Sequence, residues 1–302
     1  MSVTQDLNGK RCLVTGANSG IGWITARRLA ERGAELWLLC RDEGRGETAL
    51  EDLRRDCLTW GSPEPRLILA DLSDLESVRS ASQRLGAELD RLDILVNNAG
   101  LILTSRRESP QGHELTLAIN HLGPFALTLN LLPLLENAPQ GRIVNVASEA
   151  HRVARVDWDD LQWLKRRFSS FTVYGTTKLY NILFTRALAK RLAEKESAVT
   201  VNSLHPGVIR SGFGKDDSGI VKLLSTLAGP FLISAERGAK TSIHLAASPE
   251  VTKISGEYFI RRRPARPRPL GRSDEQAERL WNESLSLCEG FLPDPLPEDP
   301  RA

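Results

Sequence analysis

The chain has 302 residues, of which 41% are hydrophobic and 26% are charged, an ordinary balance for a globular protein with a full core. Its formal net charge is only +2 at pH 7, which argues against nucleic-acid binding. The four cysteines form no C-x-x-C pair and have no histidine at a zinc-ligand spacing, which argues against a disulfide framework and a zinc site. Cys12 and Cys40 lie in apolar runs, so we expect both to be buried.

The sequence also bears on location. The N-terminal residues lack a hydrophobic signal core, and no apolar run reaches the roughly 18 residues of a membrane-spanning helix. We therefore expect a cytoplasmic protein without a transmembrane anchor. The most lipid-like stretch, residues 220–233, is interrupted by Lys222, Gly229 and Pro230. We interpret it as a helix or lid beside a binding site, with a role at a membrane surface as the alternative.

Taken in chain order, short apolar runs alternate with helical segments. Strands are predicted at 11–15, 35–40, 66–70, 92–97, 141–147 and 199–204, with 258–259 ending a seventh, and helices at 21–32, 47–60, 75–89, 112–135 and 174–196. Strands joined by helical crossovers pair in parallel, and right-handed crossovers place helices on both faces of the sheet. The sequence therefore predicts a single α/β domain over residues 1–263, with a doubly wound parallel sheet of six to seven strands.

A C-terminal extension, residues 264–302, is rich in proline, arginine and acids and contains one predicted helix, 273–287. An arginine cluster overlaps its start, consisting of Arg261, Arg262, Arg263, Arg266 and Arg268. We interpret the cluster as a solvated surface segment. A site for an acidic partner or a phosphate group is the alternative.

A glycine-rich loop, Thr15–Gly22, follows the first predicted strand and opens the first helix. Helix N-termini present unpaired N–H groups and a positive dipole end, which suit a pyrophosphate, and glycines allow close backbone approach. The spacing is G-x-x-x-G-x-G rather than G-x-G-x-x-G. The context predicts a nucleotide site whose contacts include Gly16, Asn18, Ser19, Gly20, Ile21 and Gly22.

The end of the second strand bears on the choice of cofactor. An acid there would bind the ribose hydroxyls and favour NAD(H), but the position holds Cys40. Arg41 follows and could pair with a 2′-phosphate, with Arg45 as a second contact. We therefore favour NADP(H) over NAD(H). The alternative for Arg41 is a surface arginine beside Asp42.

Polar residues also follow the third and fourth strands. Asp71 could accept a hydrogen bond from an adenine amino group, with Leu72 beside it, or it could cap a helix in competition with Ser73 and Asp74. The fourth strand ends in Asn97-Asn98-Ala99-Gly100, which suits both backbone bracing and close cofactor approach. We expect cofactor contacts from Asn98, Ala99 and Gly100.

Tyr174 and Lys178 lie four residues apart on a predicted helix and therefore share one face. A neighbouring ammonium lowers the pKa of a phenol, so such a pair beside a cofactor can pass a proton while hydride moves. Ser148 ends the fifth strand, where its hydroxyl could bind a substrate oxygen. Asn120 lies in an apolar helix, where its amide could bridge backbone and water or could kink the helix.

Two other chemistries find little support in the sequence. The five histidines are scattered, so no metal site is expected, and Ser148 does not lie in the G-x-S-x-G elbow of a serine hydrolase.

Together these motifs resemble the short-chain dehydrogenase/reductase family over about residues 10–260. The resemblance implies a Rossmann sheet, a catalytic group of Asn120, Ser148, Tyr174 and Lys178, and cofactor contacts from Tyr174, Lys178, Pro206, Gly207 and Val208. A closer similarity to the retinol-dehydrogenase-like branch is carried by Asn18–Gly22, Asn120–Phe125, Lys178–Phe184, His205–Val208 and the long stretch between Ser148 and Tyr174. From the N-terminal residues we expect no membrane anchor of the kind that many retinoid enzymes carry there.

The resemblance implies an NADP(H)-dependent oxidoreductase acting on a small apolar carbonyl or alcohol. In reduction, Tyr174 would donate the proton, Ser148 would hold the substrate oxygen, Lys178 would lower the Tyr174 pKa and bind the nicotinamide ribose, and Asn120 would position a water. A non-catalytic NADP-binding regulator on the same fold is the alternative. The resemblance also implies a possible homodimer, whose seam could use Leu183, Leu188 and Leu192, or these residues could face the sheet.

Overall fold

The computed structural model describes residues 6–207 and 233–294. Within these ranges eight strands form one sheet in the order β3-β2-β1-β4-β5-β6-β7-β8. They are β1 (Arg11–Thr15), β2 (Glu35–Cys40), β3 (Arg66–Leu69), β4 (Ile94–Asn97), β5 (Arg142–Val146), β6 (Thr200–His205), β7 (Tyr258–Ile260) and β8 (Arg263–Ala265). All pairs are parallel except β7 with β8. The predicted doubly wound parallel sheet is confirmed.

The strand count is eight rather than six to seven because β8 adds a short antiparallel edge. The turn between β7 and β8 consists of Arg261 and Arg262, both with left-handed backbones (φ 50° and 66°). Hairpin turns with two positive φ values usually carry Asn-Gly or Asp-Gly, so an Arg-Arg turn gives no sequence signal for this hairpin.

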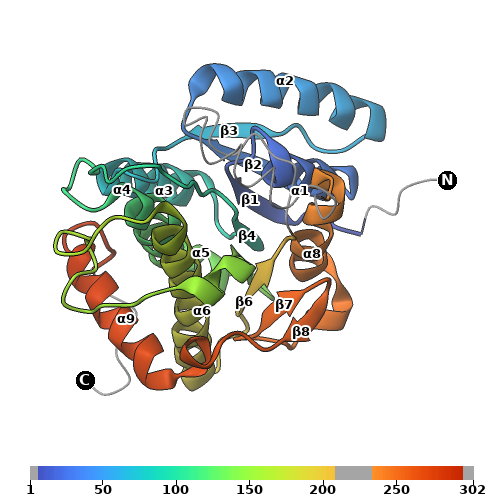
Figure 1. Cartoon of the computed structure of the whole chain (residues 1–302). Helices are drawn as coiled ribbons and strands as arrows, with labels where there is room; N and C mark the ends of the chain where they lie inside the picture. Colours follow the sequence, from blue (N-terminus) through green and yellow to red (C-terminus); the bar gives the residue numbers. More distant parts are fainter. Residues whose placement is uncertain (1–5, 208–232, 295–302) are drawn as a thin grey trace.

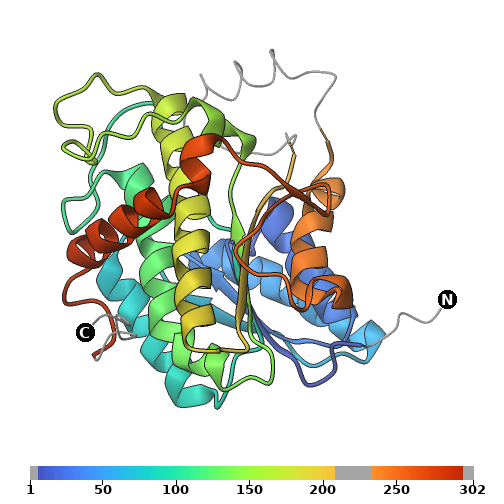
Figure 2. The same ribbon diagram turned by 90° about the horizontal axis from the view of Figure 1, so that it is seen from below.

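The longer helices are α1 (Gly20–Glu31), α2 (Glu43–Trp60), α3 (Leu75–Glu88), α5 (Gly123–Glu136), α6 (Ser170–Glu194), α8 (Ala235–Ala247) and α9 (Asp274–Leu287). Helices α3, α5 and α6 cover one face of the sheet, and α1, α2 and α8 cover the other (Figures 1 and 2). The core follows the strand alternation: in β1, Leu13 packs on the α5–α6 side, whereas Cys12 and Val14 pack on the α1–α8 side.

The order of strands reverses between β1 and β4. In open α/β sheets, ligands bind outside the carboxyl ends of the strands at this switch point. The glycine-rich loop after β1 and the Asn97–Gly100 segment at the end of β4 both lie there. The fold therefore places the two motifs side by side.

The predicted helix 112–135 is divided. It comprises α4 (Leu115–Leu117), a π-helical turn η1 (Ala118–Leu122) and α5. The Glu114 carboxylate accepts hydrogen bonds from the N–H groups of Thr116 and Leu117 at 2.9 and 2.7 Å, which fixes the start at Leu115. Among the described residues, Leu115–Glu136 is the one stretch long and apolar enough to cross a membrane, but 89% of its apolar window is buried inside the protein.

Two further helices differ from the prediction. Helix α6 begins at Ser170 rather than Tyr174, so Tyr174 lies in its second turn. Helix α8 was not predicted. The predicted lid, residues 220–233, falls almost wholly outside the described residues.

The extension packs against the domain rather than standing apart from it. Trp281 of α9 stacks on Phe184 of α6 with 6.2 Å between ring centroids, and Arg191 pairs with Glu278 at 2.8 Å. Figure 2 shows α9 next to α6. The candidate dimer residues are buried within the chain, namely Leu183, Leu188 and Leu192.

Candidate active site

The glycine-rich loop is shaped by glycines that no other residue could replace without strain. Gly16 and Gly20 have φ values of 63° and 58°, in the left-handed region. A Cβ at Gly22 would lie 2.3 Å from the Gly16 carbonyl oxygen and 2.4 Å from Asn98 Nδ2. The loop therefore folds tightly onto the first turn of α1.

The first turn of α1 suits an anion. It contains no acidic residue, and the side chain of the N-cap residue Ser19 makes no capping hydrogen bond. The first backbone N–H groups of the helix, together with its dipole, therefore lack a competing acceptor from these residues.

Thr15 and Asn98 join the glycine-rich loop to the end of β4. Thr15 Oγ1 accepts hydrogen bonds from the N–H groups of Asn98 and Ala99 at 3.0 and 2.9 Å. Asn98 Nδ2 donates to the Thr15 carbonyl at 2.9 Å. Of the two roles considered for this segment, backbone bracing is thus present. Sequence reasoning gave Thr15 no role of its own.

The end of β2 places a neutral thiol against the loop. Cys40 is buried, and burial raises its pKa to about 11, while hydrogen bonds from the N–H groups of Ala17 and Asn18 act in the opposite direction. Arg41 is exposed beside it. Asp42 accepts a hydrogen bond from the Arg45 N–H at 2.8 Å and is the N-cap of α2. The acid that follows β2 is therefore used as a helix cap.

The third strand ends in a small hydrogen-bonded turn. Asp71 Oδ1 accepts from the N–H and the hydroxyl of Ser73 at 2.8 and 2.7 Å. The cap of α3 is Asp74, which accepts from the Glu76 N–H, so Asp71 is not the helix cap. Leu72 is buried, and a Cβ at Gly123 would lie 2.3 Å from its carbonyl oxygen.

Asn120 lies in the middle of the π-helical turn and is fully buried. Its carboxamide accepts from the Leu101 N–H and donates to the Leu101 carbonyl, both at 2.8 Å, and donates to Thr177 Oγ1 at 3.0 Å. π-Helical turns inside α-helices are frequent at functional sites. Asn120 therefore links α6 to the segment after β4, and both the backbone bridge and the irregular helix are present.

Lys178 and Gly100 complete this junction. Lys178 Nζ donates to the Val146 carbonyl at 2.9 Å and is buried. A Cβ at Gly100 would lie 3.1 Å from Asn120 Oδ1 and 3.2 Å from Lys178 Nζ. Asn120, Lys178 and the end of β4 are thus in direct proximity.

Tyr174 and Ser148 face the same region. Lys178 Nζ lies 5.6 Å from the centroid of the Tyr174 ring. Burial raises the pKa of Tyr174 to about 12, and its hydrogen bond with Ser148 lowers it. Burial lowers the pKa of Lys178 to about 8. The structure thus brings together all four predicted catalytic residues, and the Ser148 hydrogen bond acts against the rise in the Tyr174 pKa that burial causes.

The end of β6 closes the site on its other side. Gly207 has a φ of 102°, and a Cβ there would lie 2.4 Å from Ile233 Cδ1. His205 Nδ1 accepts from the Glu149 N–H at 3.2 Å, and burial lowers the His205 pKa to about 4. Pro206 lies between these residues. Val208 lies outside the described residues.

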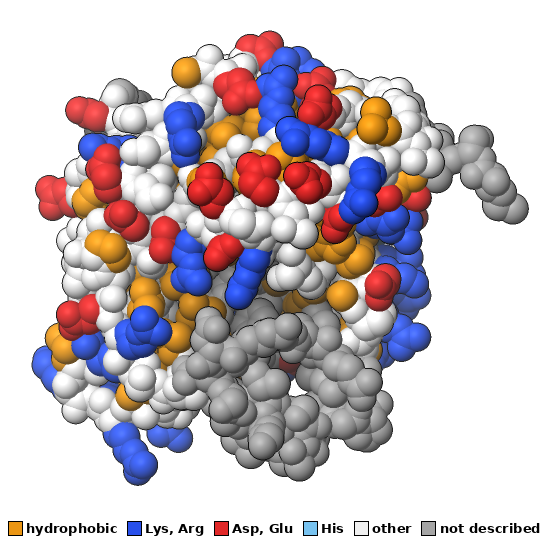
Figure 3. Space-filling view, turned by 90° about the horizontal axis from the view of Figure 1, so that it is seen from above, with side chains coloured by type: hydrophobic (Ala, Val, Ile, Leu, Met, Phe, Trp, Pro, Cys, Tyr) orange, Lys and Arg blue, Asp and Glu red, His pale blue; other side chains and the backbone are white. Residues whose placement is uncertain are grey.

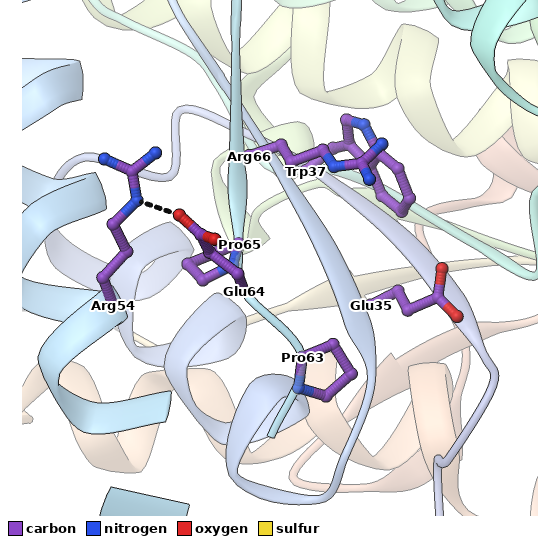
Figure 4. A pocket seen from close by; sticks show the side chains of 7 residues that line it. All are labelled: Glu35, Trp37, Arg54, Pro63, Glu64, Pro65 and Arg66. Carbon is purple, nitrogen blue, oxygen red and sulfur yellow. Dashed lines mark ion pairs between the residues drawn. The ribbon is translucent and has the colours of Figure 1, made fainter. Parts of the chain in front are cut away.

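A hollow of about 410 Å³ lies elsewhere, at the amino ends of β2 and β3 (Figure 4). Its charges are paired or stacked: Arg54 binds Glu64 at 2.8 Å, and Arg66 lies over the Trp37 ring at 5.2 Å. On the face seen from above, over α2, acidic and basic side chains are interspersed (Figure 3). Because the charges of this hollow are already paired or stacked, we place the candidate active site at the opposite, carboxyl edge of the sheet.

The fold and this edge define a class, a nucleotide-binding oxidoreductase with a doubly wound sheet. The family model described as short chain dehydrogenase matches residues 10–218. The chain is 41% identical to human retinol dehydrogenase 12, covering 93% of this chain and 87% of that protein, and 39% identical to human retinol dehydrogenase 13, covering 92% and 84%. The chain belongs to the short-chain dehydrogenase/reductase family and is retinol-dehydrogenase-like.

Solved structures agree with this assignment. A putative uncharacterized protein from Mycobacterium paratuberculosis matches with a TM-score of 0.76 at 30% identity, covering 97% of this chain and all of that one. The RhlG/NADP active-site complex from Pseudomonas aeruginosa matches with a TM-score of 0.66 at 27% identity, covering 86% and 97%. A blue fluorescent protein from a metagenomic library, in complex with NADPH, matches with a TM-score of 0.66 at 27% identity, covering 84% and 96%.

Proposed function

We propose that this chain is an NADP(H)-dependent oxidoreductase that interconverts an apolar alcohol and its aldehyde or ketone. The observation that carries the proposal is the convergence of Ser148, Tyr174 and Lys178 beside the glycine-rich loop. Ser148 hydrogen-bonds Tyr174, and the Lys178 ammonium lies 5.6 Å from the phenol ring. This group combines a proton donor, an oxygen-binding hydroxyl and a cation.

The residues present fit a dinucleotide. A Cβ would fill the space at Gly22, and the first turn of α1 carries no acid, so the loop suits a pyrophosphate. The remaining contacts would come from residues at the ends of β2, β3, β4 and β6 and from α6. The full proposed set is Gly16, Asn18, Ser19, Gly20, Ile21, Gly22, Arg41, Asp71, Leu72, Asn98, Ala99, Gly100, Tyr174, Lys178, Pro206, Gly207 and Val208.

The preference for the phosphorylated cofactor rests on two neighbouring residues. Cys40 is buried and its pKa is raised, so no negative charge stands where the 2′-phosphate would bind. Arg41 is exposed next to it and can supply the counter-charge. The similarity to proteins solved with NADP and NADPH supports the same choice.

When bound, the cofactor supplies or accepts a hydride. In reduction, Tyr174 donates its proton to the carbonyl oxygen, and a pKa of about 12 keeps the phenol protonated at neutral pH. Ser148 donates a hydrogen bond to the same oxygen as charge develops. Lys178, with a pKa of about 8, is mostly protonated at neutral pH and stabilises the phenolate left behind. Oxidation runs through the same groups in reverse.

An apolar substrate fits the relatives, which are retinol dehydrogenases. The segment between Ser148 and Tyr174 carries two tryptophans with the character of a pocket wall, Trp158 and Trp163. Trp158 instead donates from Nε1 to Gln276 of α9 at 3.1 Å, and Trp163 is buried under the Arg166 guanidinium at 3.7 Å. Phe171 is exposed at the start of α6 and could line an apolar pocket.

We also propose that the protein is cytoplasmic. The burial of the apolar helix Leu115–Glu136 supports a core role for it. A homodimer would need a surface other than the α6 face that α9 covers. Size-exclusion chromatography with light scattering would give the oligomeric state.

The test is a screen of NADPH oxidation against a panel of apolar aldehydes and ketones, including retinal. Turnover of at least one carbonyl, with NADPH strongly preferred to NADH as the reductant, supports the proposal. Cofactor binding without turnover of any carbonyl would instead favour a non-catalytic regulator.

A further inference from the structure

The backbone that follows Ser148 lies directly against the helix that carries Tyr174. Residues Glu149–Val153 form a short 3-10 helix, η2, whose N-cap is Ser148. A Cβ at Gly175 would lie 2.4 Å from the Ala150 carbonyl oxygen, and the Arg155 N–H donates to Thr176 Oγ1 at 3.1 Å. Any displacement of η2 would therefore change the position of Ser148 relative to Tyr174.

His151 connects η2 to the C-terminal extension. The side chain has no exposed surface; its Nδ1 lies 2.7 Å from the Ser148 carbonyl oxygen, and its Nε2 accepts from the Arg268 backbone N–H at 3.1 Å. A backbone N–H only donates and a carbonyl only accepts, so the ring carries its proton on Nδ1. The imidazole thus serves as a bridge with one fixed tautomer between Ser148 and Arg268.

The Arg268 side chain holds the other end of the same short helix. Its Nη1 donates to the Ala154 carbonyl at 2.6 Å and to the Arg152 carbonyl at 3.3 Å. These are carbonyls at the C-terminal end of η2, which otherwise lack helix partners. Main chain and side chain of Arg268 therefore act together on both ends of η2.

We propose that His151 and Arg268 are positioning residues that hold the Ser148 hydroxyl in the position relative to Tyr174 that the reaction needs. This inference rests on the proposed function and assigns the start of the extension to the support of the site. Two members of the arginine cluster thereby have a structural use, because Arg152 also donates to the Arg266 carbonyl at 3.4 Å. Misplacement of a reacting group by about 1 Å can cost on the order of 10²-fold in rate, so a modest shift of η2 is measurable.

The test compares Arg268→Pro with Arg268→Ala. Arg268 has φ −56° and ψ 158°, a conformation that proline adopts without strain. Both variants lose the guanidinium, but only proline removes the N–H that binds His151. We expect kcat for carbonyl reduction to be about tenfold lower in Arg268→Pro than in Arg268→Ala. The Kd for NADPH should agree within about twofold, because the cofactor contacts are untouched.

A second pair of variants probes the ring itself. His151→Asn keeps a donor near the Nδ1 position, whereas His151→Phe removes both polar atoms. We expect His151→Asn to recover several-fold of the kcat that His151→Phe loses. Equal kcat values within both pairs would overturn the inference.

Amide hydrogen exchange supplies a readout that does not depend on turnover. Exchange over residues 148–155 should be faster in Arg268→Pro than in Arg268→Ala, with the rest of the domain unchanged. Equal exchange would contradict the coupling even if both variants lost activity. A wild-type protein that reduces no carbonyl would overturn the proposed function, while the exchange comparison would still decide whether the extension holds η2.

Discussion

The two halves of the site are built on different principles. The proposed cofactor half, around Gly16, Gly22 and Asn98, depends on the absence of side chains and on short backbone contacts. The chemistry half depends on buried polar side chains, such as Asn120 and Lys178, that bind distant main-chain groups. A methyl group in the first half should therefore block binding, whereas loss of a polar atom in the second should impair reaction while binding persists.

Tyr174→Phe gives the largest expected effect. It removes the proton donor and its hydrogen bond with Ser148, and kcat for reduction should fall about 10³-fold, within the range of general acid catalysis. Binding of NADPH, measured by fluorescence titration, should stay within about threefold of the wild type. Unchanged turnover would remove Tyr174 from the mechanism.

Gly22→Ala tests the cofactor half. The new methyl would lie 2.3 Å from the Gly16 carbonyl oxygen, so the loop must open, and the Kd for NADPH should rise by about 10²-fold or more. Gly86→Ala is the matched control, since a Cβ there meets nothing within 4 Å inside α3. The control should bind normally and gain about 0.5–1 kcal/mol of stability. Normal NADPH binding by Gly22→Ala would show that a methyl group in the glycine-rich loop does not block cofactor binding.

Arg41→Ala sharpens the cofactor assignment. The exposed guanidinium is proposed to pair with the 2′-phosphate, so KM should rise about tenfold for NADPH and little for NADH. Arg55→Ala, an exposed arginine on α2, is the control and should change neither value. Equal changes for both cofactors would exclude the 2′-phosphate role.

Lys178→Met tests how the buried ammonium group affects the stability of the fold. Burial lowers the pKa of Lys178 to about 8 from 10.5, so the folded state disfavours the charged form that the unfolded chain carries. Below pH 8 the buried ammonium group destabilises the folded state by its full amount, and this destabilisation decreases as the pH rises toward 10.5. Without cofactor at pH 7, the free energy of unfolding of the variant should exceed that of the wild type by on the order of 1–3 kcal/mol. Loss of the hydrogen bond to the Val146 carbonyl reduces this gain.

The measurement is thermal unfolding of both proteins at pH 7 and pH 9.5. The advantage of the variant should shrink at the higher pH. A stability difference that grows with pH would show that the ammonium is favoured in the fold.

Local signals in the sequence predicted most of the fold. The runs that form β1, β2 and β3 are short and apolar, and the glycine-rich loop follows directly where a nucleotide site requires it. Helix α9 also matches, because Ser273 caps its N-terminus by accepting from the Gln276 N–H. All four predicted catalytic residues lie together because strand ends and one helix face are fixed by this topology.

Long-range contacts account for what could not be predicted. The π-helical turn at Asn120 depends on bonds to Leu101, and the use of Arg268 depends on a histidine far away in the chain. The sequence predicted a lowered Tyr174 pKa, but burial outweighs the Ser148 hydrogen bond and raises the pKa. The depth to which a polar side chain is buried, and the distant groups that it bonds, leave no periodic signal in a single sequence.

In the proposed reaction, hydride passes from NADPH to a carbonyl carbon and Tyr174 donates the proton. NADPH carrying deuterium at both C4 positions is supplied with an aldehyde that the screen identifies, and the alcohol product is followed by mass spectrometry. We expect one deuterium on the carbinol carbon with the wild type and almost no product with Tyr174→Phe. Product alcohol without deuterium, or equal labelled product from the variant, would contradict this mechanism.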